Sequence, residues 1–217
     1  MDLPFDPVTM QAVTRCVLLD ALGTLVRLEP PWDHLDGEPS EPLERAFRAE
    51  MSYYREHSDE GRDPDSLTAL WRRCAAILSA QLGREVAVEE MMAAIRFRAY
   101  PDAAPALAEL RALRVQLVCV SNWDYSLPDV LARVGLADEL DGVVTSAAVG
   151  ARKPDPRLFE AALEVAGCAA DEALHVGDTP TEDVEGAKAA GIRALLIDRD
   201  GGGDIESLHA IRHHLDW

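Results

Sequence analysis

The feature that most constrains the fold is a regular alternation of short apolar runs and helical patterns after residue 100. Four runs read as buried strands: 115–120, 142–146, 173–176 and 192–197. Helices are expected before, between and after them: 104–113, 127–134, 156–166, 184–190 and 205–215. Strands that alternate with helices predict a parallel sheet with helices on both faces, so the sequence predicts a doubly wound α/β core.

One more strand is expected near the N-terminus, after a lead-in over residues 1–14. The apolar residues 16–19 stand directly before Asp20, and a turn follows at Gly23 and Thr24. A continuous apolar run is typical of a strand that is buried on both faces of a parallel sheet. Asp20 would then lie at the carboxyl end of that strand, where open α/β sheets bind their ligands.

The segment between this strand and the alternating region has a different character. Residues 25–42 are rich in proline, glycine and acids and read as a loop, whereas 41–98 read as helices with apolar residues every three or four positions. Asp63 is expected to cap the second of these helices. The sequence therefore predicts a core domain over 1–24 and 100–217 and a smaller helical cap domain over 25–99.

Composition excludes several classes of partner. The chain has 39 acidic and 21 basic residues and a net charge of −18, and such a surface repels nucleic acid and anionic membranes. No apolar run approaches the ~18 residues of a membrane span, and the N-terminus has no signal-peptide pattern, so we expect a cytoplasmic protein. The four cysteines lie far apart and are expected to be buried thiols.

Polar side chains follow the ends of several predicted strands. They are Asp20 and Thr24, Ser121 and Asn122, and Asp178 with Asp183. Lys153, one of only two lysines in the chain, follows the short strand over 142–146. Because the carboxyl ends of parallel strands share one edge of a sheet, these groups can converge although they are distant in the sequence.

This set of groups suits phosphoryl transfer through an aspartate. The three aspartates supply the hard oxygen ligands that Mg²⁺ prefers, and the metal would neutralise the charge that develops on the phosphate. Thr24 and Ser121 can hydrogen-bond phosphate oxygens, and Lys153 can hold another as a point charge. Asp20 would then form an acyl phosphate that water hydrolyses.

Four segments in this order resemble the motifs of the haloacid dehalogenase superfamily, in the branch with a helical cap inserted after the first strand. They read LLDALGTL (18–25), VSN (120–122), KPD (153–155) and VGDTPTED (176–183). The resemblance implies that Asp20 is the nucleophile. It also implies that Asp20, the backbone carbonyl of Leu22 and Asp178 bind the metal, while Asp183 binds it directly or through water.

The chain departs from that pattern at Leu22. Phosphatases of the family usually carry a second aspartate there, which serves as general acid and base. Leucine has no proton to give, and general acid–base catalysis typically contributes roughly 10²- to 10⁴-fold. A phosphatase with Leu22 is therefore expected to be slow unless another group substitutes, and Asp33 and His34 are the nearest candidates in the sequence.

Two other functions stay open. Haloacid dehalogenases have a similar first motif and act without metal, but their fourth motif lacks the Gly-Asp pair found at 177–178. Buried acids beside Asp20 are costly without a cation, which favours metal binding. The other possibility is a catalytically weak or non-catalytic regulatory protein, which Leu22 supports. A phosphonate-cleaving relative is excluded, because its cap lysine has no counterpart in 25–98.

The sequence therefore predicts a Rossmann-like core with a helical cap and a Mg²⁺-dependent hydrolase of a small phosphomonoester, a phosphorylated metabolite. The catalytic candidates are Asp20 and Lys153. The phosphate-binding candidates are Thr24, Ser121, Asn122 and Lys153. Candidates for contacting the rest of the substrate are Trp123, Asp124 and Tyr125 after the second motif and Tyr53, Tyr54 and Arg55 of the cap. Trp71 is expected to pack in the interior of the cap. The oligomeric state is left open.

Overall fold

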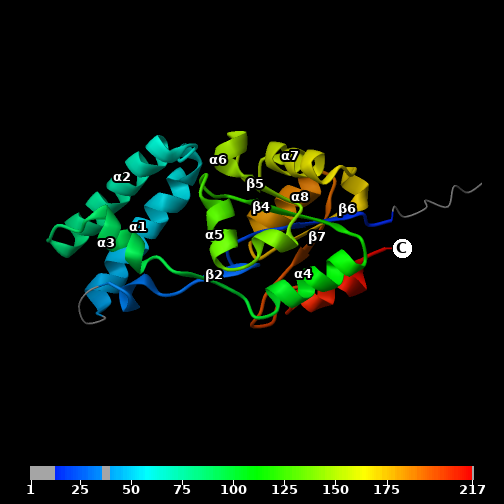
Figure 1. The fold of residues 1–217 in the computed structure, drawn as a ribbon, viewed down its shortest axis with the longest axis horizontal. Helices are drawn as coiled ribbons and strands as arrows, with labels where there is room; N and C mark the ends of the chain where they lie inside the picture. The colour runs from blue at the N-terminus through cyan, green and yellow to red at the C-terminus, as the bar shows by residue number, and fades with distance from the viewer. Residues whose placement is uncertain (1–12, 36–39, 217) are drawn as a thin grey trace, which may run out of the picture.

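A five-stranded parallel sheet forms the centre of the computed structural model, which describes residues 13–35 and 40–216. Most of the expected lead-in over 1–14 lies outside the described residues. The strands are β1 (Cys16–Leu19), β4 (Gln116–Ser121), β5 (Gly142–Thr145), β6 (Ala173–Gly177) and β7 (Arg193–Leu196). Their order is β5-β4-β1-β6-β7, and every neighbouring pair is parallel. The predicted α/β sheet is confirmed, with the first strand in the middle (Figure 1).

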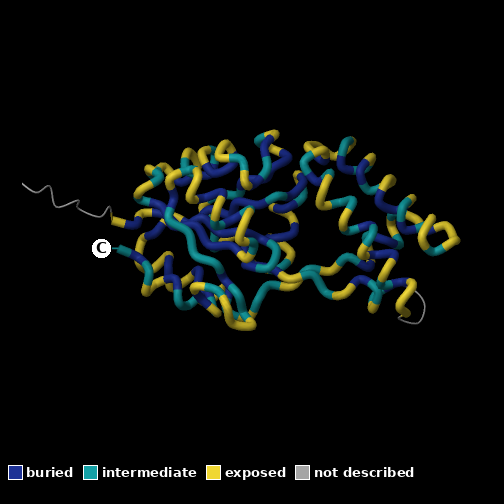
Figure 2. Tube along the Cα trace, turned by 180° about the vertical axis from the view of Figure 1, so that it is seen from behind, coloured by how far each residue is buried: buried dark blue, intermediate teal, exposed yellow. Residues whose placement is uncertain are grey.

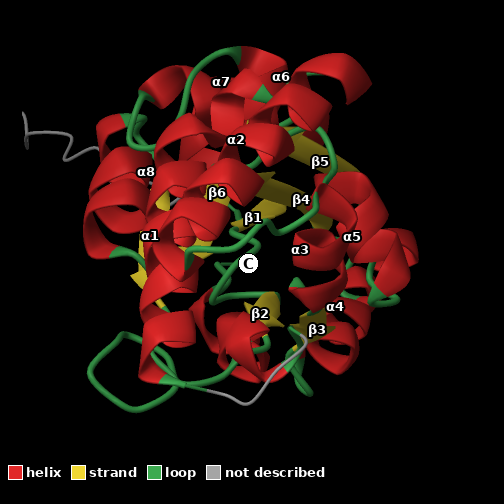
Figure 3. Ribbon diagram, turned by 90° about the vertical axis from the view of Figure 1, so that its left-hand side faces the viewer, coloured by secondary structure: helices red, strands yellow, loops and turns green. Residues whose placement is uncertain are grey.

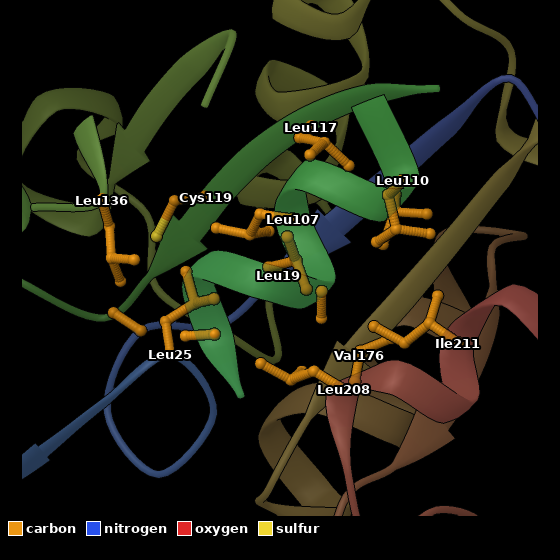
Figure 4. Packing of buried hydrophobic residues seen from close by; sticks show 14 of the residues in the cluster. Leu19, Leu25, Leu107, Leu110, Leu117, Cys119, Leu136, Val176, Leu208 and Ile211 are labelled. Atoms are coloured by element: carbon orange, nitrogen blue, oxygen red, sulfur yellow. The ribbon is translucent and has the colours of Figure 1, made fainter. Parts of the chain in front are cut away.

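Helices cover both faces of this sheet because its strands are apolar on both sides. Alternate residues of β1 face opposite layers: Val17 and Leu19 face one, and Cys16 and Leu18 face the other. The first layer consists of α4 (Ala103–Ala112), α5 (Leu127–Arg133) and the 3₁₀ helix η6 (Leu208–His214). The second consists of α7 (Pro156–Ala166) and α8 (Gly186–Ala189). Figure 4 shows leucines of α4 packed between side chains of β4 and η6.

Three helices form a second, smaller unit: α1 (Glu41–His57), α2 (Pro64–Leu82) and α3 (Val88–Ala94). They enclose a hydrophobic cluster of their own, which includes Phe47, Leu70 and Leu78. The expected cap Asp63 precedes α2 and accepts a 2.8 Å hydrogen bond from the backbone N–H of Ser66. In Figure 2 the central strands are buried throughout, whereas these helices alternate between buried and exposed residues, as helices that bury one face do.

Two short strands connect the helical unit to the core. β2 (Val26–Leu28) pairs antiparallel with β3 (Phe97–Ala99), apart from the main sheet (Figure 3). The expectations of a loop over 25–42 and of a helix up to 98 are wrong at these residues. Each strand has only three residues and its partner is distant in the sequence, so no local periodicity reveals the pairing. Leu25 and Val26, on the cap side of the expected domain boundary, pack in the cluster beneath the sheet.

Short helical turns occupy many of the remaining connections. They are η1 (Pro31–Asp33), η2 (Ser58–Glu60), η3 (Ala137–Glu139), α6 (Ser146–Val149), η4 (Ala170–Glu172) and the π-helical η5 (Pro180–Glu185). The helix expected over 184–190 therefore begins earlier, at Pro180. The C-terminal helix is shorter than expected because Ile205 forms a β-bridge with Ile197. No helix in the described part of the chain has both the length and the apolar character of a membrane span.

Two of the four cysteines are not thiols, which corrects our expectation. Cys16 of β1 forms a disulfide with Cys168, just after α7, and their Cα atoms are 6.6 Å apart. The bond joins the sheet to the helix layer that covers it. The two residues are separated by 152 positions, so their spacing gave no sign of the pairing. Cys74 and Cys119 are buried thiols, as expected.

Candidate active site

The carboxyl ends of β1, β4 and β6 bring the expected polar residues to one edge of the sheet. Asp20 directly follows β1, and its backbone N–H donates to the carbonyl oxygen of Val176 in β6 (2.9 Å). Ser121, the last residue of β4, donates its hydroxyl to Asp20 Oδ1 (2.9 Å). Both neighbouring strands therefore hold Asp20. Within the described residues, its second oxygen, Oδ2, accepts no hydrogen bond.

Lys153 connects Asp20 to Asp183. Its Nζ lies 2.6 Å from Asp20 Oδ1 and 2.5 Å from Asp183 Oδ1, and all three side chains are buried. Burial alone would lower the pKa of Lys153, but the two carboxylates outweigh it and raise that pKa, so the ammonium stays charged. Burial raises the pKa of Asp20, although the ammonium opposes the shift. Since breaking a buried ion pair leaves an unpaired charge, the three side chains depend on one another.

Asp178 and Asp183 reach the same point from the segment after β6. One carboxylate oxygen from each of Asp20, Asp178 and Asp183 lies within 4.8 Å of the others. Two glycines make room for the acids: a Cβ on Gly23 would lie 2.0 Å from Asp178 Oδ2, and one on Gly177 would lie 2.1 Å from Asp183 Cγ. The three oxygens suit a hard divalent cation such as Mg²⁺, and they repel one another without positive charge nearby.

Sequence reasoning missed His175, in the middle of β6. It is fully buried, and its Nε2 lies 3.0 Å from Asp183 Oδ1, the oxygen that also binds Lys153. Asp183 Oδ2 accepts the backbone N–H of Thr179 (3.0 Å), so both of its oxygens are held. Burial would raise the pKa of Asp183, but Lys153 and His175 hold it well below its ordinary range. A single histidine inside an apolar strand was the signal that could have revealed this residue.

Asn122 holds the backbone of Lys153. Its Oδ1 accepts the backbone N–H of Lys153 (2.7 Å), and its Nδ2 donates to the carbonyl oxygen of Lys153 (3.1 Å). The same Nδ2 donates to Glu182 Oε2 (3.0 Å), a partner that the sequence did not suggest. Asn122 therefore fixes the segment from which the Lys153 side chain reaches Asp20.

Thr24 and Leu22 lie in the loop after Asp20. The Thr24 side chain is fully buried, and its hydroxyl has no hydrogen-bond partner in the part of the chain that the structure describes. Because an unsatisfied buried hydroxyl costs free energy, Thr24 is suited to bind an oxygen of a ligand. Leu22 is half-buried and lines the cavity between the core and the helical unit.

That cavity has a volume of about 380 Å³. Its walls are mostly apolar, with Leu22, Phe97 and Trp123 on one side and Trp71, Met91 and Met92 on the other. Trp71 packs against the cluster inside the helical unit, as expected, and it also lines the cavity. Asn122, the neighbour of Ser121, forms another part of the wall, so the cavity adjoins the acidic cluster.

Polar contacts beside the cavity hold the helical unit on the core. Tyr54 donates its hydroxyl to Asp124 Oδ2 (2.7 Å), which joins two of the candidate substrate contacts to each other. Two further bonds are those from the Tyr125 backbone N–H to the carbonyl of Gly61 (2.8 Å) and from the Arg152 guanidinium to the carbonyl of Arg55 (2.6 Å).

The remaining candidates divide by position. Trp123, Asp124, Tyr54 and Arg55 line the cavity, whereas Tyr125 and Tyr53 are absent from its lining. Tyr53 stacks on His57 with ring centroids 4.0 Å apart. Asp33 and His34 do not line the cavity either, and His34 Nε2 lies 3.1 Å from Glu29 Oε2.

Two phosphatases resemble parts of this chain in sequence. It is 44% identical to the phosphoserine phosphatase of Thermus thermophilus over 108 residues, which cover 48% of this chain and 42% of that protein. It is 40% identical to the phosphoglycolate phosphatase of Rhodospirillum rubrum over 99 residues, which cover 45% of this chain and 41% of that protein. The chain therefore spans less than half of the length of these two relatives.

A solved structure and a family model also match this chain. The solved structure of the L-2-haloacid dehalogenase from Xanthobacter autotrophicus is 28% identical, has a TM-score of 0.65, and matches over 86% of this chain and 78% of that chain. A model of haloacid dehalogenase-like hydrolases matches residues 14–191, a range that contains Asp20, Lys153 and all of the acidic cluster. The chain therefore belongs to the haloacid dehalogenase-like hydrolase family.

Proposed function

We propose that the protein is a Mg²⁺-dependent phosphatase that acts on a small phosphomonoester through Asp20. The observation that carries this proposal is the contact of Lys153 with Asp20 and Asp183, close to Asp178. It brings one buried cation and three carboxylates close together, which supports attack by one carboxylate and metal binding by the others. The similarity to a phosphoserine phosphatase and a phosphoglycolate phosphatase supports phosphate as the group that is attacked.

Asp20 serves as the nucleophile in this proposal. Ser121 and Lys153 hold its Oδ1, which leaves Oδ2 to approach phosphorus. An oxygen–phosphorus bond forms at Asp20 while the ester bond to the leaving alcohol breaks, and water later hydrolyses the aspartyl phosphate. The hydroxyl of Thr24, which has no partner among the described residues, and the ammonium of Lys153 bind phosphate oxygens in this state.

Mg²⁺ fits the residues that are present. Asp20, Asp178 and Asp183 converge on one point, and the backbone carbonyl of Leu22 is the proposed further ligand. Burial and the neighbouring Asp183 raise the pKa of Asp178. A cation bound there would offset the repulsion between these two carboxylates. When bound, the metal neutralises charge on the phosphate oxygens.

We also propose that residues 25–99 act as a cap domain that selects the substrate. The cavity lies between this segment and the core, and side chains of both line it. The bond from Tyr54 to Asp124 joins this segment to the core beside the cavity, which supports the proposal. Closure of this kind excludes water from the reacting groups.

The test is phosphate release from a broad panel of phosphorylated metabolites, with Mg²⁺ and with a chelator. The proposal expects activity that needs Mg²⁺ and that is lost in Asp20→Asn. Asp138→Asn, at an exposed position of η3, is the matched control and should retain full activity. Release of phosphate at the normal rate by Asp20→Asn would remove Asp20 from the role of nucleophile.

A haloacid dehalogenase is the second candidate. The apolar Leu22 and the similarity to the enzyme of Xanthobacter autotrophicus favour it. Asp20 would then attack the carbon that carries the halogen and displace a halide ion. Release of chloride from 2-chloropropionate in the presence of a chelator, without any phosphatase activity, would establish this reaction instead. A folded protein with neither activity would be a regulatory member of the family.

A further inference from the structure

The cavity next to the loop that carries Asp20 has mostly apolar walls. Its volume of about 380 Å³ suits a small ligand. Trp71, Phe97 and Trp123 contribute aromatic faces, and the rings of Phe97 and Trp123 are tilted with centroids 5.0 Å apart. Aromatic ligands pack well against such rings in offset or tilted arrangements. A polar substrate as small as phosphoserine would leave much of this apolar wall without a ligand group packed against it.

The lining residue that is nearest to Asp20 in the sequence cannot protonate a leaving group. Leu22 lies two residues after Asp20 and has no exchangeable proton on its side chain. Tyr54 also lines the cavity, but its hydroxyl proton is donated to Asp124, and burial raises its pKa well above the usual value. The oxygens of Asp124 accept bonds from Tyr54 and from the backbone N–H of Ser126, so Asp124 is held as an acceptor.

Glu50 is the remaining buried carboxyl of the lining. It is 4% exposed and comes from α1, and burial raises its pKa, against the effect of a hydrogen bond with Cys74. Cys74 belongs to α2, so Glu50 is bonded within the helical unit and not to the loop that carries Asp20. Asp129, Arg55 and Arg133, which also line the cavity, are exposed.

We propose that the substrate is an aryl phosphate, whose ring occupies the apolar cavity and whose oxygen leaves without being protonated by the protein. This proposal rests on the phosphatase function proposed above. A phenolic hydroxyl has a pKa of about 10, whereas water, the parent of aliphatic alcohols, has a pKa of about 15.7. A phenolate is therefore a far better leaving group than an alkoxide where no acid is available.

The proposed step balances without a general acid. Asp20 Oδ2 forms a bond to phosphorus, the bond from phosphorus to the phenolic oxygen breaks, and the electron pair stays on that oxygen. The phenolate takes its proton from water after it leaves. Water then attacks the phosphorus of the aspartyl phosphate, which regenerates the Asp20 carboxylate and releases inorganic phosphate together with a proton.

The test compares phenyl phosphate with benzyl phosphate, which has the same ring but an aliphatic leaving oxygen. The measured quantity is kcat/KM, because it reports the steps up to the first irreversible bond cleavage. We expect phenyl phosphate to be preferred by at least about 100-fold, the lower range of what general acid catalysis contributes. Ring-substituted phenyl phosphates should react faster as the pKa of the phenol falls.

Two substitutions at position 22 separate acidity from polarity. Leu22→Asp supplies a proton donor and should reduce the preference for phenyl over benzyl phosphate by about 10-fold or more. The asparagine of Leu22→Asn has nearly the same shape as the aspartate of Leu22→Asp but no acidic proton. This variant should therefore leave the preference for phenyl phosphate unchanged. Trp71→Ala should raise KM for both aromatic substrates and leave their ratio unchanged.

Several outcomes would overturn the proposal. Equal kcat/KM values for phenyl and benzyl phosphate would show that the protein does protonate its leaving group. A selective loss of benzyl phosphate hydrolysis in Glu50→Gln would identify Glu50 as the donor. Activity on phosphoserine or phosphoglycolate that exceeds activity on phenyl phosphate would overturn this inference and leave the phosphatase function intact. No hydrolysis of any phosphate ester in the presence of Mg²⁺ would remove both.

Discussion

Asn122 binds both polar groups of the Lys153 backbone. Its Oδ1 accepts the N–H at 2.7 Å, and its Nδ2 donates to the carbonyl oxygen at 3.1 Å. The side chain of Lys153 in turn binds two carboxylates of the acidic cluster. The position of the buried ammonium is therefore set by a residue that directly follows β4, and the acidic cluster depends on that support.

The first prediction is that Asn122→Ala lowers activity by displacing Lys153. A misplacement of about 1 Å at a reacting group can cost about 10²-fold in rate, so we expect a fall in kcat of that size. Steady-state kinetics on a phosphate ester that the protein hydrolyses measures it. Gln116→Ala, at the exposed start of β4, is the control. An Asn122→Ala protein with full activity would show that Lys153 needs no such support.

The second prediction concerns His175, which lies against the same oxygen of Asp183 as Lys153 does. Residues that orient metal ligands typically contribute about 10- to 100-fold to metal affinity. We therefore expect an effect of about 10- to 100-fold in His175→Leu. The measured quantity is the Mg²⁺ concentration at which half of the maximal thermal stabilisation is reached, and it should rise by about this factor. The exposed His213→Leu should have no effect. An unchanged Mg²⁺ titration in His175→Leu would contradict the assignment of Asp183 to the metal site.

The third prediction is a pH-dependent gain of stability in Glu50→Gln. Burial raises the pKa of Glu50 in the folded state, so the folded protein binds this proton more tightly than the unfolded chain does. The contribution of Glu50 to stability therefore falls as pH rises, starting near its ordinary pKa of about 4.3 and ending above the raised pKa. Glutamine does not titrate, so the variant should gain relative stability across this window.

Thermal melting of both proteins between about pH 4 and pH 8 measures this effect. The melting temperatures should agree at the acid end, and Glu50→Gln should be the more stable at the neutral end. Glu56→Gln, at an exposed position of the same helix, should show no such trend. A difference that is the same at every pH would mean that Glu50 does not titrate in this range.

The main sheet and its edge of polar residues could be predicted from the sequence. β1, β4 and β6 are mostly apolar runs, each of which ends at or just before a polar residue, and this pattern located Asp20, Ser121 and Asp178. The helix expected over 156–166 has those same bounds, because Pro156 begins it and Gly167 ends it with a left-handed backbone. These signals are local, so one sequence is sufficient to read them.

The features that sequence reasoning missed depend on distant partners. β2 and β3 are short and pair across the whole helical unit. Cys16 and Cys168 meet only because α7 packs on the sheet. The role of Asn122 as a support for Lys153 follows from the path of the loop before α7, and no spacing within either motif indicates it.

The most direct test of the account is to trap the covalent intermediate. Because Leu22 supplies no base for the second step, the aspartyl phosphate is expected to accumulate during turnover. Wild-type protein mixed with phenyl phosphate and Mg²⁺, quenched in acid and digested, should yield a peptide that carries one phosphoryl group on Asp20, and Asp20→Asn should yield none. A phosphoryl group on a different residue, or rapid turnover with no labelled peptide at any time, would contradict the account.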